Sequence, residues 1–281
     1  LWAESSDYSD DLKISDEILN QVNDSYKKIR NTFKYLLGAL SDIDLSNLVE
    51  YDKLPKLEKY MLHKLFKFTD YTRKQYEEYQ FHNVVNSVND FCINDLSSFY
   101  FDIRKDSLYC DSVNSLIRKS YLTVLYRIFS VLLHYISPIL PFSAEEIYSH
   151  AKFMRYKHES IHLNNDCYIS NDWLSPKLEE EFLTIKNLRS KVFAELENWR
   201  QDSLIGSNLE ASVTVNSKFL CEDLNNILLV SEVLYKENTD EILVSPLKNN
   251  GNYKKCVRCW KYHKSTTDMC HRCDSVDELY T

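Results

Sequence analysis

Apolar residues recur at helical spacing from the start of the chain. Ser15 is a good helix N-cap, and Asp16 and Glu17 suit the positive end of the helix dipole. The apolar positions that follow recur at helical spacing. They are Ile18, Val22, Ile29, Phe33, Leu36, Leu37 and Leu40. The pattern predicts a long helix that begins just after Ser15.

The same spacing predicts four more helices in the first half of the chain. One begins at Pro55, which suits a first turn, one runs from about residue 81 to 99, and one covers roughly 112–136. Ser143 and Glu146 have the spacing of a capping box for a short further helix. Long helices with short connections favour an antiparallel bundle.

The pattern changes in the second half. A polar stretch over 157–176 is typical of a connector, and apolar residues at helical spacing follow over about 178–202. Short segments rich in β-branched residues then predict strands at 211–215, 227–233 and 242–244. These strands favour a small α/β unit over further bundle.

The sequence thus predicts a mainly α protein in four segments. They are a helical bundle over 1–155, a connector and junction helix over 156–203, a small α/β domain over 204–250, and a cysteine module over 251–281.

Two CxxC pairs make the cysteine module the most specific chemical signal. Cys256 and Cys259 are separated by ten residues from Cys270 and Cys273. Four thiolates at this spacing suit one tetrahedral zinc ion, and a closed four-cysteine site has no open position for a substrate. The prediction is therefore a structural zinc. A redox-active pair of CxxC motifs and a rubredoxin-like iron site remain alternatives, and His263 or His271 could replace a cysteine.

Charge and composition narrow the function classes. The net charge of −8 argues against a protein that coats nucleic acid through overall positive charge. The segment 242–267, however, has no acidic residue and six cations, which predicts a local basic face. Trp260 within it either covers the metal or offers a flat face to an unstacked base. The remaining cysteines (Cys92, Cys110, Cys167 and Cys221) are predicted to be small buried apolar residues.

No signal peptide and no apolar run of about 18 residues is present, so a cytoplasmic, reducing setting without a membrane is expected.

Several motifs resemble those of bacterial-type isoleucyl-tRNA synthetases. The run from Lys255 to Trp260 (KCVRCW), with the later Cys270-His271-Arg272-Cys273, resembles the C-terminal zinc module of that family. Tyr26 with the run 29–32 (IRNT) is similar to the start of its anticodon-binding bundle, and the run 138–147 (PILPFSAEEI) is similar to the end of that bundle. The resemblance covers nearly the whole chain.

The resemblance implies a function and a set of partners. The bundle and the zinc module would bind the anticodon stem-loop of isoleucine tRNA, as part of a monomeric class Ia ligase that includes the remainder of the synthetase chain. Arg30, Asn31 and Trp260 occupy the matching RNA-contacting positions. The basic residues beside Trp260 complete the expected contact set, namely Lys255, Arg258 and Lys261.

The chain itself is expected to be non-catalytic. The HIGH and KMSKS signatures that bind ATP in this family occur nowhere in the sequence. ATP and Mg²⁺ would therefore belong only to a separate catalytic domain. Two other functions remain open: a zinc-ribbon domain that binds proteins and not RNA, and an iron electron carrier.

Overall fold

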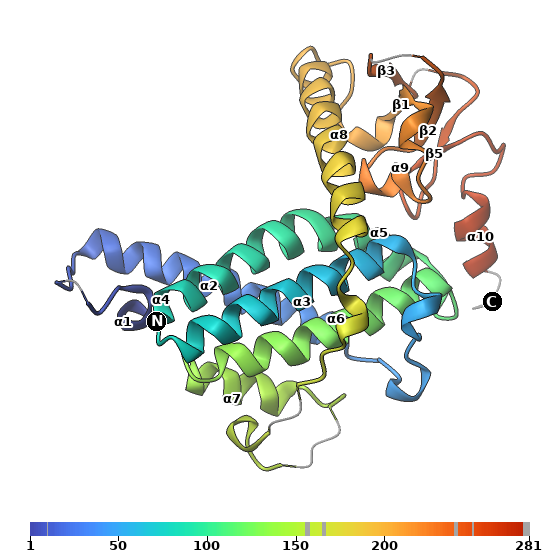
Figure 1. Cartoon of the computed structure of the whole chain (residues 1–281). Helices are drawn as coiled ribbons and strands as arrows, with labels where there is room; N and C mark the ends of the chain where they lie inside the picture. The colour runs from blue at the N-terminus through green and yellow to red at the C-terminus, as the bar shows by residue number, and fades with distance from the viewer. Residues whose placement is uncertain (10, 155–157, 165–166, 239–240, 249, 278–281) are drawn as a thin grey trace. The chain divides into compact units, whose positions relative to one another are not determined.

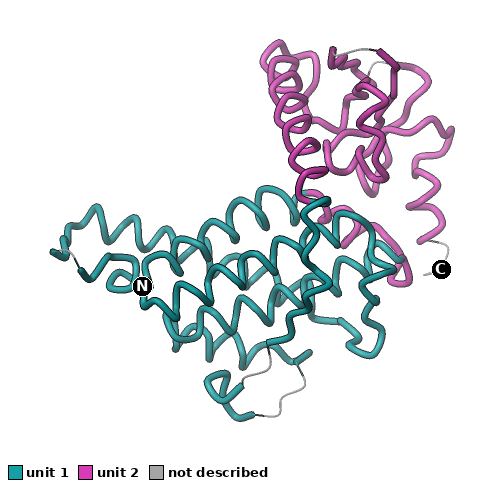
Figure 2. The backbone as a smooth tube through the Cα atoms, in the orientation of Figure 1, with its two compact units in different colours: residues 1–102, 116–178 teal, residues 103–115, 179–281 magenta. Residues whose placement is uncertain are grey.

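A computed structural model describes residues 1–9, 11–154, 158–164, 167–238, 241–248 and 250–277 (Figure 1). The chain divides into two compact units (Figure 2). The first contains residues 1–102 and 116–178, and the second contains residues 103–115 and 179–281. These bounds differ from the four predicted segments, because residues 103–115 group with the C-terminal part. Residues 155, 156 and 281, which bound three of the predicted segments, lie outside the described residues.

The first unit is a helical bundle, as predicted. Its helices are α1 (Trp2–Ser5), α2 (Asp16–Ala39), α3 (Lys56–Glu77), α4 (Phe81–Asp90), η3 (Phe91–Phe101), α6 (Leu116–Ile136) and α7 (Pro141–His150). Single 3₁₀ turns occur at Leu45–Asn47, Tyr51–Lys53, Ile161–Leu163 and Asn171–Trp173. Helix α2 begins where the sequence predicts, and the Ser15 hydroxyl accepts a hydrogen bond from the Ile18 N–H at 3.2 Å. Ile29, Phe33 and Leu36 then turn one face of α2 into the core.

The third predicted helix has an unusual continuation. After α4 the backbone keeps winding as the π-helix η3 through eleven residues, and then returns to the α conformation as α5 (Asp102–Cys110). Leu96 and Phe99, two apolar residues within the predicted helix, are buried in this stretch. The apolar pattern does not distinguish a π-helix from an α-helix, because both wind one apolar face inward.

One predicted cap in the first unit is wrong. Helix α7 begins at Pro141, not near Ser143, and its N-cap residue Leu140 makes no side-chain cap. Proline suits the first position of a helix because it lacks the N–H that would be unsatisfied there. Ser143 therefore lies inside the first turn, and its hydroxyl is 3.1 Å from the hydroxyl of Tyr26.

The second unit combines helices with a small sheet. Its elements are α5, α8 (Pro176–Gln201, of which residues 179–201 belong here), β1 (Ala211–Asn216), α9 (Leu224–Ile227), β2 (Glu232–Lys236), β3 (Leu243–Pro246), β4 (Lys254–Lys255), β5 (Tyr262–His263) and α10 (His271–Asp277). Further 3₁₀ turns occur at Asn208–Glu210 and Ser217–Phe219. Strand β1 is central, parallel to β2 and antiparallel to β3. Val213 pairs with Val233 and Val244.

The strand predicted at 227–233 is wrong over residues 227–231. Leu224 and Ile227 belong to helix α9, and the strand begins only at Glu232. Leu224, Ile227 and Leu228 are all buried, and their spacing of three and four residues places them on one helical face. Among the described residues no helix is long and apolar enough to span a bilayer.

Candidate functional site

The four cysteines of the C-terminal module come together, although they lie in two separate parts of the sequence. Their sulfur atoms all lie within 4.8 Å of one another, and Cys259 Sγ is 3.7 Å from Cys270 Sγ. Three of the side chains are buried, and Cys270 is half-buried. Four soft sulfur donors in a closed set match the preference of zinc, so the cluster could hold a zinc ion.

Two short turns bring the sulfurs together. The first pair lies between β4 and β5, where the Cys256 N–H donates to the carbonyl of Lys261 at 2.9 Å. The second pair opens α10, where the Cys273 N–H donates to the Cys270 carbonyl at 2.9 Å. The Cys270 N–H in turn points to Cys256 Sγ at 3.4 Å and links the two turns.

Backbone N–H groups and burial shift the pKa values of the cysteine thiols. Burial alone would raise the pKa of Cys256, but N–H groups of Cys259, Cys270 and Arg258 outweigh burial and lower that pKa to about 6. Burial raises the pKa of Cys259 and of Cys273. The metal-binding group contains neither His263 nor His271, and His263 Nδ1 accepts from the Ser265 N–H at 3.3 Å.

Cys110 is a fifth cysteine at this site, and its position in the sequence does not indicate that it lies there. It belongs to residues 103–115 of the second unit and packs in the same buried cluster as Cys256, Cys259 and Cys273. Burial raises its pKa to about 11, so it stays a neutral thiol. The prediction that the scattered cysteines are buried is confirmed for Cys92 and Cys110, whereas Cys167 and Cys221 are half-buried.

Trp260 presents its ring to solvent. The side chain is 62% exposed, and Lys255 Nζ lies 5.9 Å from the ring centroid. Lys255 is itself exposed. A ring that covered the metal site would be buried, so the geometry favours the other interpretation, an aromatic face with a cation beside it.

The other two predicted cations of the module are engaged within the second unit. Lys261 Nζ lies 3.0 Å from an Asp106 carboxylate oxygen and also donates to the side-chain carbonyl of Asn226. Arg258 is half-buried and donates to the carbonyl of Cys273 at 3.3 Å.

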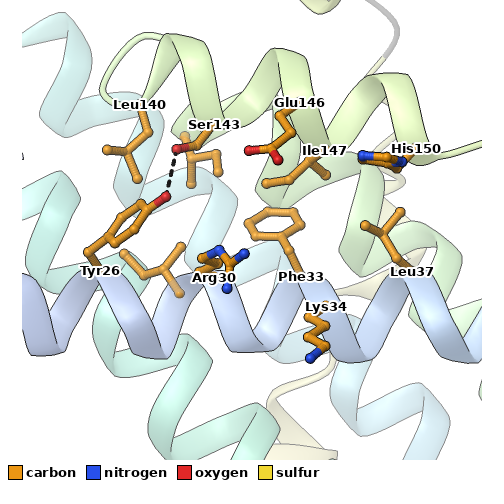
Figure 3. Close-up of a pocket in the computed structure, with 12 residues that line it drawn as sticks. Tyr26, Arg30, Phe33, Lys34, Leu37, Leu140, Ser143, Glu146, Ile147 and His150 are labelled. Atoms are coloured by element: carbon orange, nitrogen blue, oxygen red, sulfur yellow. Dashed lines mark hydrogen bonds between the residues drawn. The ribbon is translucent and has the colours of Figure 1, made fainter.

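The first unit carries a groove between α2 and α7 (Figure 3). Its volume is about 260 Å³, and its apolar walls include Phe33, Leu37 and Ile147. Polar side chains also line the groove, namely Tyr26, Arg30 and Lys34 from α2 and Ser143, Glu146 and His150 from α7. Asn31 is exposed on α2 next to Arg30. Of the two predicted contact residues on this helix, Arg30 therefore lines a concave site.

Comparisons with known proteins agree with these features. Residues 58–215 match the family model described as the anticodon-binding domain of tRNA ligase. The chain is also 42% identical over 275 residues to an isoleucine–tRNA ligase of Pelagibacter ubique, across 94% of this chain. Isoleucine–tRNA ligases of Fervidobacterium nodosum and Kosmotoga olearia are 35% and 36% identical across 98% and 100% of it.

The chain spans only 30% to 32% of the length of these three relatives. The match to the family model, by contrast, extends over more than half of the chain, from the start of α3 to the end of β1. This chain belongs to the family of anticodon-binding domains of tRNA ligases.

Proposed function

We propose that this chain is the part of an isoleucine–tRNA ligase that binds the anticodon stem-loop of isoleucine tRNA. One observation carries the proposal: proteins named isoleucine–tRNA ligase match 94% to 100% of the chain, well beyond the residues that the family model covers. The specificity therefore rests on the relatives, and the structure supplies the residues that could make the contacts.

In the first unit, the residues that would contact tRNA lie mainly on α2. Arg30 combines a charged guanidinium with a position on the wall of the groove, so it can bind a phosphate or the edge of a base. Leu37 and Ile147 give that groove half-buried apolar walls, which suit the face of an unstacked base. Asn31 adds an exposed amide that can donate and accept hydrogen bonds.

In the second unit, the residues that would contact tRNA lie in the cysteine module. Trp260 provides a face for base stacking, and Lys255 beside it provides positive charge for the backbone. Arg258 lies on the same turn, where its side chain also holds the Cys273 carbonyl. A base on Trp260 would be held by stacking, while Lys255 would make the affinity depend on salt.

The metal that we propose for this module is zinc, held by Cys256, Cys259, Cys270 and Cys273. When bound, zinc supplies folding energy to a module of about 25 residues that has little core of its own. The protein's contribution is to fix the two turns, to exclude water from three of the four sulfurs, and to keep Trp260 outside.

The chemistry of the ligase belongs elsewhere. The intact enzyme would attach isoleucine to its tRNA with ATP and Mg²⁺ in a separate catalytic domain and would act in the cytoplasm as a monomer. This chain, without the HIGH and KMSKS signatures, would bind tRNA and perform no chemistry.

A salt-titrated binding assay tests the proposal. The zinc-loaded 281-residue chain is titrated with isoleucine tRNA and with the same tRNA carrying a swapped anticodon. We expect tighter binding of the first at every salt concentration, because base contacts specify sequence while phosphate contacts do not. Equal affinity for both tRNAs would remove the recognition claim.

A further inference from the structure

A continuous series of polar contacts runs through the second unit. It joins residues 103–115 to helix α9 and to both halves of the cysteine module. In order along the series, the residues are Arg104, Asp223, Asn226, Lys261, Asp106, Arg272 and Asp111. All seven belong to the same unit, although the sequence separates Asp106 from Arg272 by 166 positions.

Asp106 is the branch point of this series. The Arg272 guanidinium donates two parallel hydrogen bonds to its carboxylate, of 2.7 and 2.9 Å, and a third to the Asp111 carboxylate at 3.1 Å. Lys261 Nζ lies 3.0 Å from the same carboxylate. Bidentate pairs of this kind combine strength with a fixed orientation. The side chains of Asp106 and Lys261 are only 20% and 16% exposed, so solvent screens their attraction weakly.

The electrostatics of Asp106 agree with this geometry. Burial would raise its pKa, but the hydrogen bonds and charges of Arg272 and Lys261 outweigh burial and lower the pKa to about 2. Asp106 is therefore ionised near neutral pH.

Asp106 holds both metal-binding turns at once. Lys261 directly follows Trp260 at the end of the first turn, and Arg272 lies between Cys270 and Cys273 in the second. Strand β5 has its own attachment, since the Tyr262 N–H donates to the Ser231 hydroxyl at 2.7 Å. The contacts through Arg272 tie α10 to residues 103–115, where Cys110 also packs in the buried cluster that contains Cys273.

A metal ion bound by four thiolates fixes the shape of the module but not its orientation on the rest of the unit. We infer that Asp106 is a positioning residue that orients the cysteine module for RNA binding, and that Lys261 and Arg272 act by holding Asp106 and not by contacting RNA. The RNA part of this inference rests on the proposed function. It reassigns Lys261, which the sequence had placed among the tRNA contacts.

The test compares Asp106→Asn with Lys261→Met and the double variant in the zinc-loaded 281-residue chain. Asp274→Asn is the matched control, because Asp274 is an exposed carboxylate on α10 outside the series. Cobalt absorbance reports whether the four thiolates still bind metal. Fluorine NMR with 5-fluorotryptophan reports the surroundings of Trp260, whose resonance is identified by its loss in Trp260→Phe.

We expect Asp106→Asn to leave the cobalt spectrum unchanged, to shift or broaden the Trp260 resonance, and to weaken binding of isoleucine tRNA about ten-fold. The double variant should lose no more affinity than Asp106→Asn alone, because both residues act through one contact. Lys261→Met should also leave the salt dependence of binding unchanged. By contrast, Lys255→Met should reduce that slope by about 0.7 to 0.9.

Two results would overturn the inference. One is an unchanged Trp260 resonance in Asp106→Asn, and the other is a reduced salt slope in Lys261→Met, which would make Lys261 a direct phosphate contact. If the wild-type chain showed no preference for isoleucine tRNA, the proposed function would fail. The Trp260 resonance would then still decide whether Asp106 positions the module.

Discussion

The backbone N–H of Trp260 donates to the carbonyl of Cys256 across 3.0 Å, in a turn that holds Trp260 at a φ of 64°. A left-handed φ favours glycine and costs a bulky residue roughly 1–2 kcal/mol. The metal-binding turn therefore has a large ring at the position where glycine would be the least strained residue. Strain of this kind, combined with an exposed ring, supports a functional role for the side chain.

Replacing Trp260 with glycine should separate stability from function. Trp260→Gly removes the strain, so we expect zinc affinity to stay equal or rise, by up to about 1 kcal/mol. Binding of isoleucine tRNA should weaken by about 1–3 kcal/mol, the usual contribution of one stacked base. Competition with a chromophoric chelator measures the first quantity, and a binding titration measures the second. Val257→Ala, on an exposed residue of the same turn, should change neither. Undiminished tRNA binding by Trp260→Gly would contradict the stacking role.

Metal removal should unfold one part of the chain and spare another. We expect about one zinc per purified, colourless chain, by elemental analysis. A strong chelator should expose the backbone amides of 251–277 to hydrogen exchange, because the metal supplies that module's folding energy. The amides of α2 and α6 should stay protected. Cys259→Ser should reproduce the chelator's effect, whereas Cys167→Ser, outside the cluster, should not. A coloured, iron-containing protein would instead favour the electron carrier.

The features that could be predicted from the sequence are those that depend on neighbouring residues. Ser15 caps α2 as predicted, because a cap depends only on residues within one helical turn. Strand β1 and the two cysteine pairs likewise lie where their local patterns indicate. The capping box at Ser143 was wrong because a competing local signal, Pro141, starts the helix earlier. A proline start and a capping box only two residues apart are both weak local signals. The sequence does not show which of them begins the helix, because that depends on the packing around them.

Contacts between distant parts of the chain could not be predicted. Nothing in the spacing of Asp106 or Cys110 shows that residues 103–115 group with the C-terminal unit. The basic residues around Trp260 led to the prediction that Lys261 contacts RNA. A sequence shows which residues are cations, but it does not show which anions they pair with. Only the three-dimensional arrangement shows that the Lys261 ammonium group already forms an ion pair with Asp106.

The groove on α2 gives a second test of RNA binding, independent of the metal. Arg30→Met should weaken binding of isoleucine tRNA by about 1–3 kcal/mol without lowering stability, because Arg30 is exposed at the groove. Lys28→Met is the matched control: it removes a charge from the same helix at an exposed position that does not line the groove. Binding titrations with thermal unfolding measure both. Equal losses in the two variants would mean that α2 contributes only general charge.

The ion pair between Arg104 and Asp223 should support the second unit. Arg104 is 1% exposed, and Asp223 starts α9 at a left-handed φ of 74°. Asp223→Asn keeps a side chain that tolerates this φ but removes the charge facing a buried guanidinium, so we expect a loss of about 2 kcal/mol. The exposed pair between Asp24 and Lys27 provides the control, and Asp24→Asn should change stability by less than about 0.5 kcal/mol. Hydrogen exchange under increasing denaturant measures both losses separately in each unit. Equal small losses for the two variants would show that burial adds nothing to the Arg104 pair.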